Sequence, residues 1–376
     1  MKKVVFIGHR DLYFGAESVM FRIISFLKKN GLADPQVVLP KSIHSGFRKQ
    51  LDQEGIAATA LVKYKLIGGG IFRCILCLLY NMPALMQLWL TFRKKGIDRV
   101  YTNTSVNILG PMLAWALKKP HIWHFHEQPT GGTFKWIPKG LFPLYKSLIN
   151  KKDNQVIFIS HTQKELWEKE FGFVISNFEI IYTPPVFLPA PPAVLQQSGI
   201  LSFGYLGSFT ESKNLISLIQ SYARLKVQHP ALNSRLVLMG GGEYEPELRK
   251  AISAMQCKDE VIILEHSSNV LPFFSMTDIF VLPSYFESWG LVVLEAISQQ
   301  KAIIVTSNTG LKEILKQNED CIFVNPYHQD ELYNAMEKLV TEPEFREMIK
   351  VNSFQTLEKL GLAAGFDQSV RSLFIN

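Results

Sequence analysis

The sequence predicts an α/β protein with two doubly wound parallel-sheet domains. Apolar runs with strand character alternate with helix-sized segments in both halves of the 376-residue chain, and this alternation favours a parallel sheet covered by helices on both faces. A proline cluster, Thr183-Pro-Pro-Val-Phe-Leu-Pro-Ala-Pro-Pro192, interrupts the pattern and is typical of an interdomain linker. We therefore expect a first domain over residues 1–185, a linker over 186–199, a second domain over 200–355, and a C-terminal helix over 356–376 that could pack back on the first domain.

The individual strands follow from short apolar runs in each half. The first half predicts a helix over 17–30 and strands at residues 4–8, 36–39, 99–103, 121–126 and 155–160. The second half predicts strands at 201–206, 235–239, 261–264, 279–282 and 302–306. In open parallel sheets ligands bind beyond the carboxyl ends of the strands, so two such domains predict a ligand there, in a cleft between them.

Composition excludes some classes of protein. Hydrophobic residues make up 47% of the chain, ample for large cores, and the four cysteines are too few for a disulfide framework, which fits a reducing compartment. Cys74 and Cys77 form a C-x-x-C, but they lie in an apolar helix-like run without a second ligand pair, so packing is favoured over zinc binding. The apolar stretch at the N-terminus is too short for a signal peptide and predicts a first strand.

Charge is distributed unevenly along the chain. Residues 1–185 carry 25 Lys and Arg against 12 Asp and Glu, a net +13, whereas residues 186–376 carry 15 against 21, a net −6. A basic half indicates an anionic partner. No nucleic-acid-binding signature appears, so we expect no nucleic acid and favour an anionic membrane surface.

The apolar run Ile71–Phe92 has basic residues on both sides, at Lys63 and Lys65 before it and at 93–95 after it. It is nearly long enough to span a bilayer, but Arg73, Asn81, Pro83 and Gln87 argue against spanning. Two interpretations remain open: an ordinary buried helix of the first domain, or partial insertion into the headgroup region of an anionic membrane.

The segment 278–297 has the order strand, loop, helix that phosphate sites use. The first turn of a helix has unpaired N–H groups and the positive end of the helix dipole, so the backbone at Ser288, Trp289, Gly290 and Leu291 could receive a diphosphate. A carboxylate one turn further, at Glu295, could accept hydrogen bonds from a ribose diol, and Glu287 in the loop could meet sugar hydroxyls.

This wording, Tyr-Phe-Glu287-Ser-Trp-Gly-Leu-Val-Val-Leu-Glu295-Ala, resembles the signature of glycosyltransferase family 4. The resemblance implies the GT-B fold, with two Rossmann-like domains facing each other across a cleft. It also implies a retaining enzyme that moves a sugar from a UDP- or GDP-sugar to a glycan or lipid-linked acceptor, as in bacterial surface polysaccharide or lipopolysaccharide synthesis. Neither a cofactor nor a metal is implied, because the nucleotide sugar is a substrate. The implied location is the cytoplasm, at the inner face of the cell membrane.

Further segments of the second half fit the same donor site. Gly207 and Ser208 form a small-residue turn after a strand, and Lys213 near the next helix could approach a diphosphate as a point charge. In the family this loop also carries an arginine next to the glycine, and Ser208 stands in its place, so Lys213 would carry more of the charge. The glycine turn at 240–242 lacks the full dinucleotide fingerprint, which disfavours a nicotinamide site. His266 falls in the segment that contacts the base in the family.

The first half matches the family less closely. Phe14-Gly15 resembles a glycine-rich loop in which the backbone approaches the donor, and one of the family's two glycines is replaced by Phe14. Alternation along a strand places His124 and His126 on one face and Phe125 on the other. His126 corresponds to the family's cleft histidine, whereas His124 fits a structural role. Metal binding by the two histidines is disfavoured, since only Glu127 lies near enough in sequence to complete a set.

We expect Lys213 and the start of the helix to stabilise the negative charge that grows on the departing phosphate. By resemblance, Glu287 positions the donor sugar and is not a nucleophile, and retention follows from front-face attack. Two other functions share this fold and remain open: a sugar-nucleotide epimerase without an acceptor site, and a catalytically silent scaffold. The departures at Phe14 and Ser208 keep the silent scaffold in consideration.

Overall fold

The computed structural model describes residues 1–376 except 14, 44, 130–137, 186–198, 268 and 376. The chain divides into two compact units, unit 1 (Met1–Thr183 with Ala363–Asn376) and unit 2 (Pro184–Leu362). Most of the predicted linker over 186–199 lies outside the described residues. The C-terminal segment for which the sequence predicts one helix contains parts of two, α12 and α13, because Gly361 in the left-handed conformation (φ 54°) ends α12.

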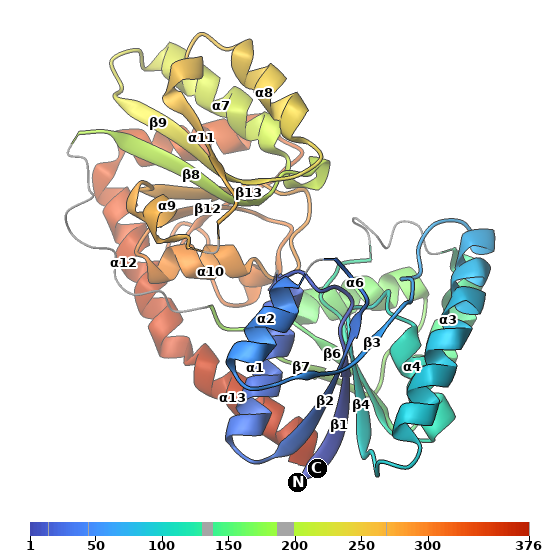
Figure 1. Ribbon diagram of the computed structural model, residues 1–376. Helices are drawn as coiled ribbons and strands as arrows, with labels where there is room; N and C mark the ends of the chain where they lie inside the picture. Colours follow the sequence, from blue (N-terminus) through green and yellow to red (C-terminus); the bar gives the residue numbers. More distant parts are fainter. Residues whose placement is uncertain (14, 44, 130–137, 186–198, 268, 376) are drawn as a thin grey trace. The chain divides into compact units, whose positions relative to one another are not determined.

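Unit 1 contains a seven-stranded parallel sheet in the order β3-β2-β1-β4-β5-β6-β7 (Figure 1). Its strands are β1 (Lys2–Ile7), β2 (Ala33–Pro40), β3 (Ala58–Val62), β4 (Arg99–Asn103), β5 (His121–His124), β6 (Asn154–Phe158) and β7 (Phe178–Ile180). Its helices are α1 (Gly15–Lys29), α2 (Gly46–Gln53), α3 (Ile71–Phe92), α4 (Leu109–Leu117), α5 (Phe142–Ile149), α6 (His161–Phe171) and α13 (Leu362–Ile375), with the 3₁₀ turn η2 (Lys139–Leu141).

Helices cover both faces of this sheet because alternate strand residues are apolar on each side. Val5 and Ile7 of β1 join the cluster that contains the inner residues of α3 and α4. Phe6, between them, faces the other way and stacks on Phe374 of α13, with ring centroids 5.9 Å apart. Arg99 of β4 also donates a hydrogen bond to the carbonyl of Leu373. The C-terminal helix is therefore part of the core of unit 1.

Unit 2 contains a six-stranded parallel sheet in the order β10-β9-β8-β11-β12-β13. Its strands are β8 (Leu201–Ser208), β9 (Ser234–Gly241), β10 (Val261–Glu265), β11 (Ile279–Leu282), β12 (Ala302–Thr306) and β13 (Ile322–Val324). Its helices are α7 (Leu215–Gln228), α8 (Glu245–Ser253), α9 (Leu271–Ser275), α10 (Leu291–Ser298), α11 (Gln329–Thr341) and α12 (Pro343–Leu360), with the 3₁₀ turns η4 (Glu211–Lys213), η5 (Lys258–Glu260) and η6 (Gly310–Glu313).

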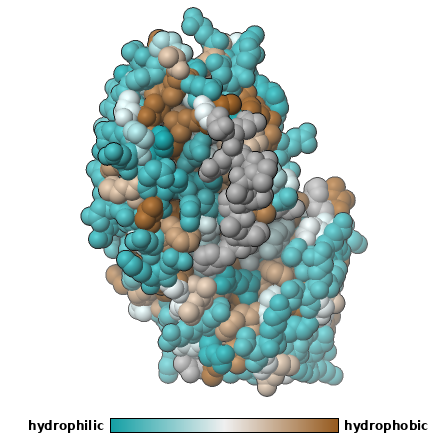
Figure 2. Space-filling model, turned by 90° about the vertical axis from the view of Figure 1, so that its left-hand side faces the viewer, coloured by the Kyte–Doolittle hydropathy of each residue, from teal (hydrophilic) through white to brown (hydrophobic). Residues whose placement is uncertain are grey.

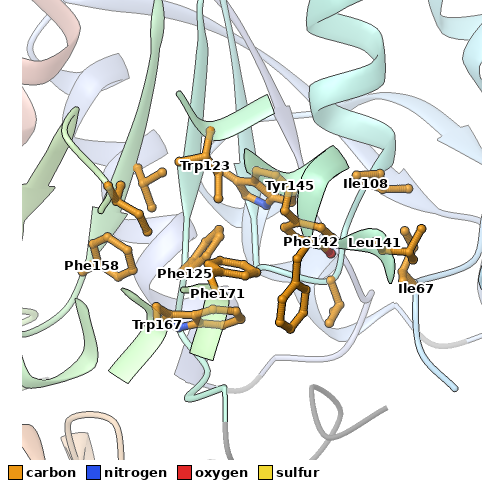
Figure 3. Close-up of a cluster of buried hydrophobic side chains, with 14 of the residues drawn as sticks. Ile67, Ile108, Trp123, Phe125, Leu141, Phe142, Tyr145, Phe158, Trp167 and Phe171 are labelled. Atoms are coloured by element: carbon orange, nitrogen blue, oxygen red, sulfur yellow. The ribbon is translucent and has the colours of Figure 1, made fainter. Parts of the chain in front are cut away.

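An aromatic cluster anchors one end of the unit 1 sheet (Figure 3). Trp123 stacks on Tyr145 at 5.2 Å and meets Phe125 edge-to-face at 5.3 Å, and Phe125 in turn contacts Trp167. These rings hold β5 and the residues after it, so that the intervening histidines must face the opposite side of the sheet. At the surface, by contrast, the face in Figure 2 shows hydrophobic residues in separate patches among hydrophilic ones.

Unit 1 buries two histidines of β5, and a third, His126, is half-buried just after the strand. His121 and His124 are 1% and 0% exposed, and burial lowers the pKa of each to about 3. Burial also lowers the pKa of His126 well below its ordinary value. A base whose pKa falls on folding binds fewer protons in the folded than in the unfolded state, so acid favours unfolding.

We predict that unit 1 loses stability as the pH falls below the ordinary histidine value. Below about pH 6.5 the unfolded histidines gain protons that the buried ones exclude, at about 1.4 kcal/mol per pH unit for each. Hydrogen exchange of unit 1 amides, measured in the full chain between about pH 7 and pH 5, should therefore show a fall in the free energy of opening.

His121→Gln should make that acid dependence shallower, whereas His161→Gln, at an exposed position, should leave it unchanged. Equal slopes for the parent and His121→Gln would contradict the buried neutral state of His121.

Candidate functional site

Both sheets reverse their winding direction at one place, between β1 and β4 in unit 1 and between β8 and β11 in unit 2. At such a switch point the loops after two neighbouring strands diverge and leave room for a ligand at the carboxyl edge of the sheet. The predicted residues Gly207 and Ser208 end β8, Lys213 lies in the turn after it, and Glu287 follows β11. These four candidates of unit 2 therefore lie in or after the two strands of its switch point.

Two loops of unit 2 are joined by an ion pair. The Nζ of Lys213 lies 2.7 Å from Oε2 of Glu287, with the two side chains 22% and 18% exposed. Backbone hydrogen bonds hold the loops in place, since the N–H of Tyr285 donates to the carbonyl of Ser212 at 2.9 Å and that of Glu287 to Asn308 at 3.0 Å. The sequence assigned Lys213 and Glu287 to different parts of a ligand, and the structure brings them into direct contact.

The start of α10 lies against this ion pair. Gly290 precedes the helix in the left-handed conformation, φ 81° and ψ 54°. A Cβ added to Gly290 would meet Leu311 at 3.2 Å and Cγ of Glu287 at 3.4 Å, so the glycine lies within van der Waals reach of the Glu287 side chain. Lysine, glutamate and the positive end of an eight-residue helix thus form one cluster.

Glu295 lies one turn into α10, half-buried. Burial raises its pKa from 4.5 to about 7. A carboxyl group with this pKa changes its charge near neutral pH, so a ligand that hydrogen-bonds the ionised form would draw out its proton.

The remaining predicted residues of unit 2 have different environments. Ser208 is exposed at the end of β8, and its carbonyl accepts a hydrogen bond from the Tyr205 hydroxyl at 2.9 Å. Ser288 and Leu291 are half-buried, whereas the Trp289 side chain is 2% exposed and belongs to the core. His266 is exposed in the loop after β10. Trp289 therefore has only its backbone to offer a ligand.

Strands β8 and β9 of unit 2 approach each other closely through glycine. At Gly240, with φ 155°, a Cβ would lie 1.9 Å from the carbonyl oxygen of Gly207. No side chain fits there, which keeps the carboxyl ends of β8 and β9 flush against each other.

In unit 1, polar side chains gather beyond β1, β4 and β5. His126, two residues past β5, has its Nε2 2.7 Å from Oδ1 of Asn103, and the amide of Asn103 donates to the carbonyl of Ala16 in α1. The His124 and His126 rings lie on one side of the chain, 4.0 Å apart, as alternation predicts. Burial, then the imidazoles of His124 and His9, keep the pKa of His126 well below its usual value, so this histidine is neutral at neutral pH.

Sequence reasoning missed a second pair in the same cluster. Nδ1 of His9, after β1, lies 2.9 Å from Oε1 of Glu17 in α1, and the two side chains are 7% and 1% exposed. The signal was present, since a histidine directly after the first strand and an acid in the following helix turn are polar groups at a switch point. Gly15, predicted to approach the donor, is the first residue of α1 and exposed, whereas Phe14 lies outside the described residues.

His124, the neighbour of His126, has the surroundings of a structural residue. Nδ1 of His124 is 2.7 Å from the Tyr101 hydroxyl, and the side chain is fully buried. Across the described parts of the chain, no group of three His, Cys, Asp or Glu side chains is arranged to hold a metal ion.

Comparisons with known proteins agree on one family. Residues 15–184 match the model of Glycosyltransferase Family 4, and residues 197–356 match that of Glycosyl transferases group 1. An uncharacterised glycosyltransferase of Haemophilus influenzae is 26% identical over 51% of this chain. The lipopolysaccharide core biosynthesis glycosyltransferase LpsE of Rhizobium meliloti is 24% identical over 71% of this chain and 77% of its own length.

The match to the Haemophilus protein spans about half of that relative, 53% of its length. Among solved structures, Anabaena Alr3699/HepE in complex with UDP and glucose has a TM-score of 0.82 at 17% identity, with 99% of both chains covered. At this identity the likeness concerns the fold alone. Together with the two parallel sheets, it shows that the chain has the GT-B fold, as the sequence predicts.

We predict that Glu295→Gln stabilises unit 2 at alkaline pH. Because folding raises the pKa of Glu295 to about 7, the ionised carboxylate opposes folding, and the penalty grows from about pH 4.5 to pH 7 and then levels off. The amide should therefore raise the free energy of unfolding by about 3 kcal/mol near pH 8 and have little effect near pH 4.5.

Hydrogen exchange of the α10 amides at both pH values measures this difference. Glu247→Gln, at an exposed position of α8, is the matched control. A gain for Glu295→Gln that is the same at both pH values would contradict the elevated pKa.

Proposed function

The chain belongs to glycosyltransferase family 4, and on that premise we propose that it transfers a sugar from a nucleotide-diphosphate sugar to a glycan or lipid-linked acceptor with retention of anomeric configuration. The observation that carries the proposal is the cluster of Lys213, Glu287 and the start of α10 at the unit 2 switch point. It combines a cation, backbone N–H groups and a carboxylate that can hold sugar hydroxyls.

Each part of the donor, the diphosphate, the ribose and the sugar, has a protein group in or beside this cluster that can bind it. The diphosphate lies at the first turn of α10, beside the Lys213 ammonium, and the ribose diol donates to Glu295, one turn deeper. Glu287 holds hydroxyls of the donor sugar, and its ion pair with Lys213 keeps both side chains oriented before the donor arrives. UDP is a suitable nucleotide, since the solved relative from Anabaena holds UDP and glucose; GDP is the alternative.

The transfer step exchanges one bond at the anomeric carbon. The acceptor oxygen attacks from the side of the departing phosphate, the bond from the anomeric carbon to the phosphate oxygen breaks, and the acceptor's proton moves to that phosphate oxygen. Charge grows on the distal phosphate, where Lys213 and the α10 dipole stabilise it. No resident cofactor or metal takes part in the proposed reaction.

In unit 1, neutral His126 is proposed to contact the donor sugar and the acceptor. Its ring is fixed by Asn103, and as a neutral imidazole it offers hydrogen bonding without competing charge. The lipopolysaccharide role of the Rhizobium relative supports an acceptor in surface-polysaccharide synthesis. We further propose that the enzyme works in the cytoplasm, bound peripherally to the anionic inner face of the cell membrane.

We predict that a panel of UDP- and GDP-sugars, tested with and without lipid-linked glycan acceptors, contains a donor from which release of nucleotide diphosphate depends on the acceptor. Lys213→Ala should lower turnover by roughly 100-fold or more, the scale of losing one preorganised charge. Lys250→Ala, at an exposed position of α8, should leave turnover unchanged.

Other results would overturn the assignment. Conversion of the donor sugar without an acceptor would indicate an epimerase, and the absence of both reactions would indicate a silent scaffold. Activity of Lys213→Ala within a few-fold of the parent would place the phosphate site elsewhere. Since Ser208 is exposed, Ser208→Arg has room at the strand end and should tighten donor binding.

We predict that affinity for the nucleotide sugar rises with pH up to about 7 and then levels off. Below about pH 7 the Glu295 carboxyl is protonated and offers fewer acceptor sites to the ribose diol, so donor affinity should weaken several-fold by about pH 6. Calorimetry with UDP-glucose, or with the donor from the panel, suits this test because a diphosphate diester has no group of its own that titrates in this range.

Glu295→Gln should abolish this pH dependence, and Glu295→Ala should weaken binding by about 1–3 kcal/mol. A pH dependence that survives in Glu295→Gln, or unchanged affinity of Glu295→Ala, would remove Glu295 from the ribose site.

A further inference from the structure

Helix α3 of unit 1 has an inner face that is packed against the domain. Its buried residues follow helical spacing, Cys74, Cys77, Asn81, Ala84, Leu85, Leu88 and Phe92. The C-terminal part of this face joins the cluster with Leu109 and Leu113 of α4, and Cys74 joins the aromatic cluster around Trp123. Through this inner face, α3 packs in the hydrophobic core of unit 1.

The outer face of α3 is also apolar, and it is exposed. We define it by residues with helical spacing whose side chains are 45–76% exposed, Ile71, Phe72, Ile75, Leu76, Leu79, Met82, Met86 and Leu90. A helix at the surface of a soluble domain ordinarily turns polar residues to water. An apolar row of this length indicates a surface that is covered in the working state of the protein.

The charges close to this helix in the sequence are of one sign. Between Glu54 and Asp98 the chain contains no acidic residue, while basic residues stand at Lys63, Lys65, Arg73 and 93–95. Two of them lie over aromatic rings of the helix: Nζ of Lys65 is 4.6 Å from the Tyr80 ring centroid, and Cζ of Arg93 is 4.6 Å from that of Trp89. An apolar row with basic flanks complements the headgroup region of an anionic bilayer.

By length and composition alone, α3 is the one helix among the described residues apolar enough to cross a membrane, and a third of its most apolar window is buried. Asn81 argues against crossing. Its side chain is fully buried and makes two hydrogen bonds to the backbone of Lys65, at 2.8 and 2.9 Å. Extracting α3 from the domain would break both bonds and strip the inner face from its core.

We propose that α3 is an in-plane membrane-binding helix, whose outer face enters the headgroup and upper acyl region of an anionic bilayer while its inner face stays packed in unit 1. The inference deepens the proposed function and rests on it for the purpose of docking, which is to bring the site to a membrane-borne acceptor. In this proposal α3 does not span the membrane, and its outer face is covered by lipid and not by a second copy of the chain or another protein.

The test is co-sedimentation of the full chain with vesicles of phosphatidylcholine containing about one-third phosphatidylglycerol. The outer-face variant is Leu76→Gln/Leu79→Gln/Met86→Gln, and the matched control is Val174→Gln/Val227→Gln/Val351→Gln, at positions 52–71% exposed elsewhere in the chain. The outer-face variant should bind at least roughly ten-fold more weakly than the parent, and the control should bind as the parent does.

Charge is tested in the same assay. Lys94→Gln/Lys95→Gln should weaken binding by up to about five-fold per residue, and Lys151→Gln/Lys152→Gln, an exposed pair elsewhere in unit 1, should have a much smaller effect. Binding of the parent should fall with added salt and with the omission of phosphatidylglycerol. Equal binding to neutral vesicles would overturn the anionic surface.

Orientation is tested by fluorophores attached at Phe72→Cys, Leu79→Cys and Leu90→Cys, one at a time, with quenchers at known depths in the bilayer. The four native cysteines are buried. An in-plane helix about 33 Å long should place all three labels at one shallow depth. A label at 79 much deeper than those at 72 and 90 would indicate spanning and refute the proposal, and this readout decides the matter even if the triple variant fails to fold.

Two further measurements separate this inference from the proposed function. The outer-face variant should keep the parent's affinity for the nucleotide sugar in vesicle-free solution, because no residue of the outer face belongs to the proposed donor site. Vesicle binding with no sugar transfer would leave the docking intact and refute the function. If the parent self-associates without vesicles and the outer-face variant does not, while both bind vesicles equally, the face is an interface between copies and the membrane proposal is wrong.

Discussion

The constraint on which the rest of the molecule depends is parallel pairing with a reversal of winding direction, at β1 and β4 in one unit and at β8 and β11 in the other. Parallel strands place all their carboxyl ends at one edge, and the reversal separates two neighbouring loops there. Residues far apart in the chain then meet: Lys213 and Glu287, 74 positions apart, are joined by an ion pair 2.7 Å long. The chemistry proposed for the glycosyltransferase uses groups that only this topology collects.

Burying ionisable groups at these strand ends costs free energy of folding, and packing of the surrounding apolar residues offsets this cost. The half-buried Glu295 has its pKa raised to about 7, and the histidines near β5 are held neutral. In unit 1 the aromatic cluster around Trp123 and Phe125 packs against β5, which carries His124, and against the residues that lead to His126. In unit 2 the buried strand β11 and the Trp289 side chain support the loop that carries Glu287. Apolar packing on one side of each strand end therefore stabilises polar or ionisable groups on the other.

Much of this fold could be predicted from the sequence, and the omissions have physical causes. Central strands such as β1 and β11 are continuous apolar runs, because both of their faces are covered. The short outer strands β3, β7 and β13 were missed, because a strand with fewer buried residues has a weaker periodic signal. The candidate residues of the Glu287 loop were identifiable from the local sequence, whereas the contact between Lys213 and Glu287, 74 positions apart, is tertiary and leaves no mark on the local sequence. The end of β5 at His124, short of the predicted 126, is a boundary that backbone hydrogen bonding decides.

Helix α3 has two apolar faces, and only the structure distinguishes the buried face from the exposed one. Its composition suits a buried helix, a spanning helix and an interfacial helix alike, so the sequence leaves both the buried and the interfacial interpretation open. The inner row, with Asn81 hydrogen-bonded to Lys65, packs as a core helix does, while the outer row exposes apolar side chains. Mean hydropathy averages over both rows and cannot distinguish them, whereas the burial of each side chain shows to which row the residue belongs. A helix that satisfies the core with one face has no need to leave it in order to bind lipid with the other, which is why docking in the plane of the membrane requires no rearrangement of unit 1.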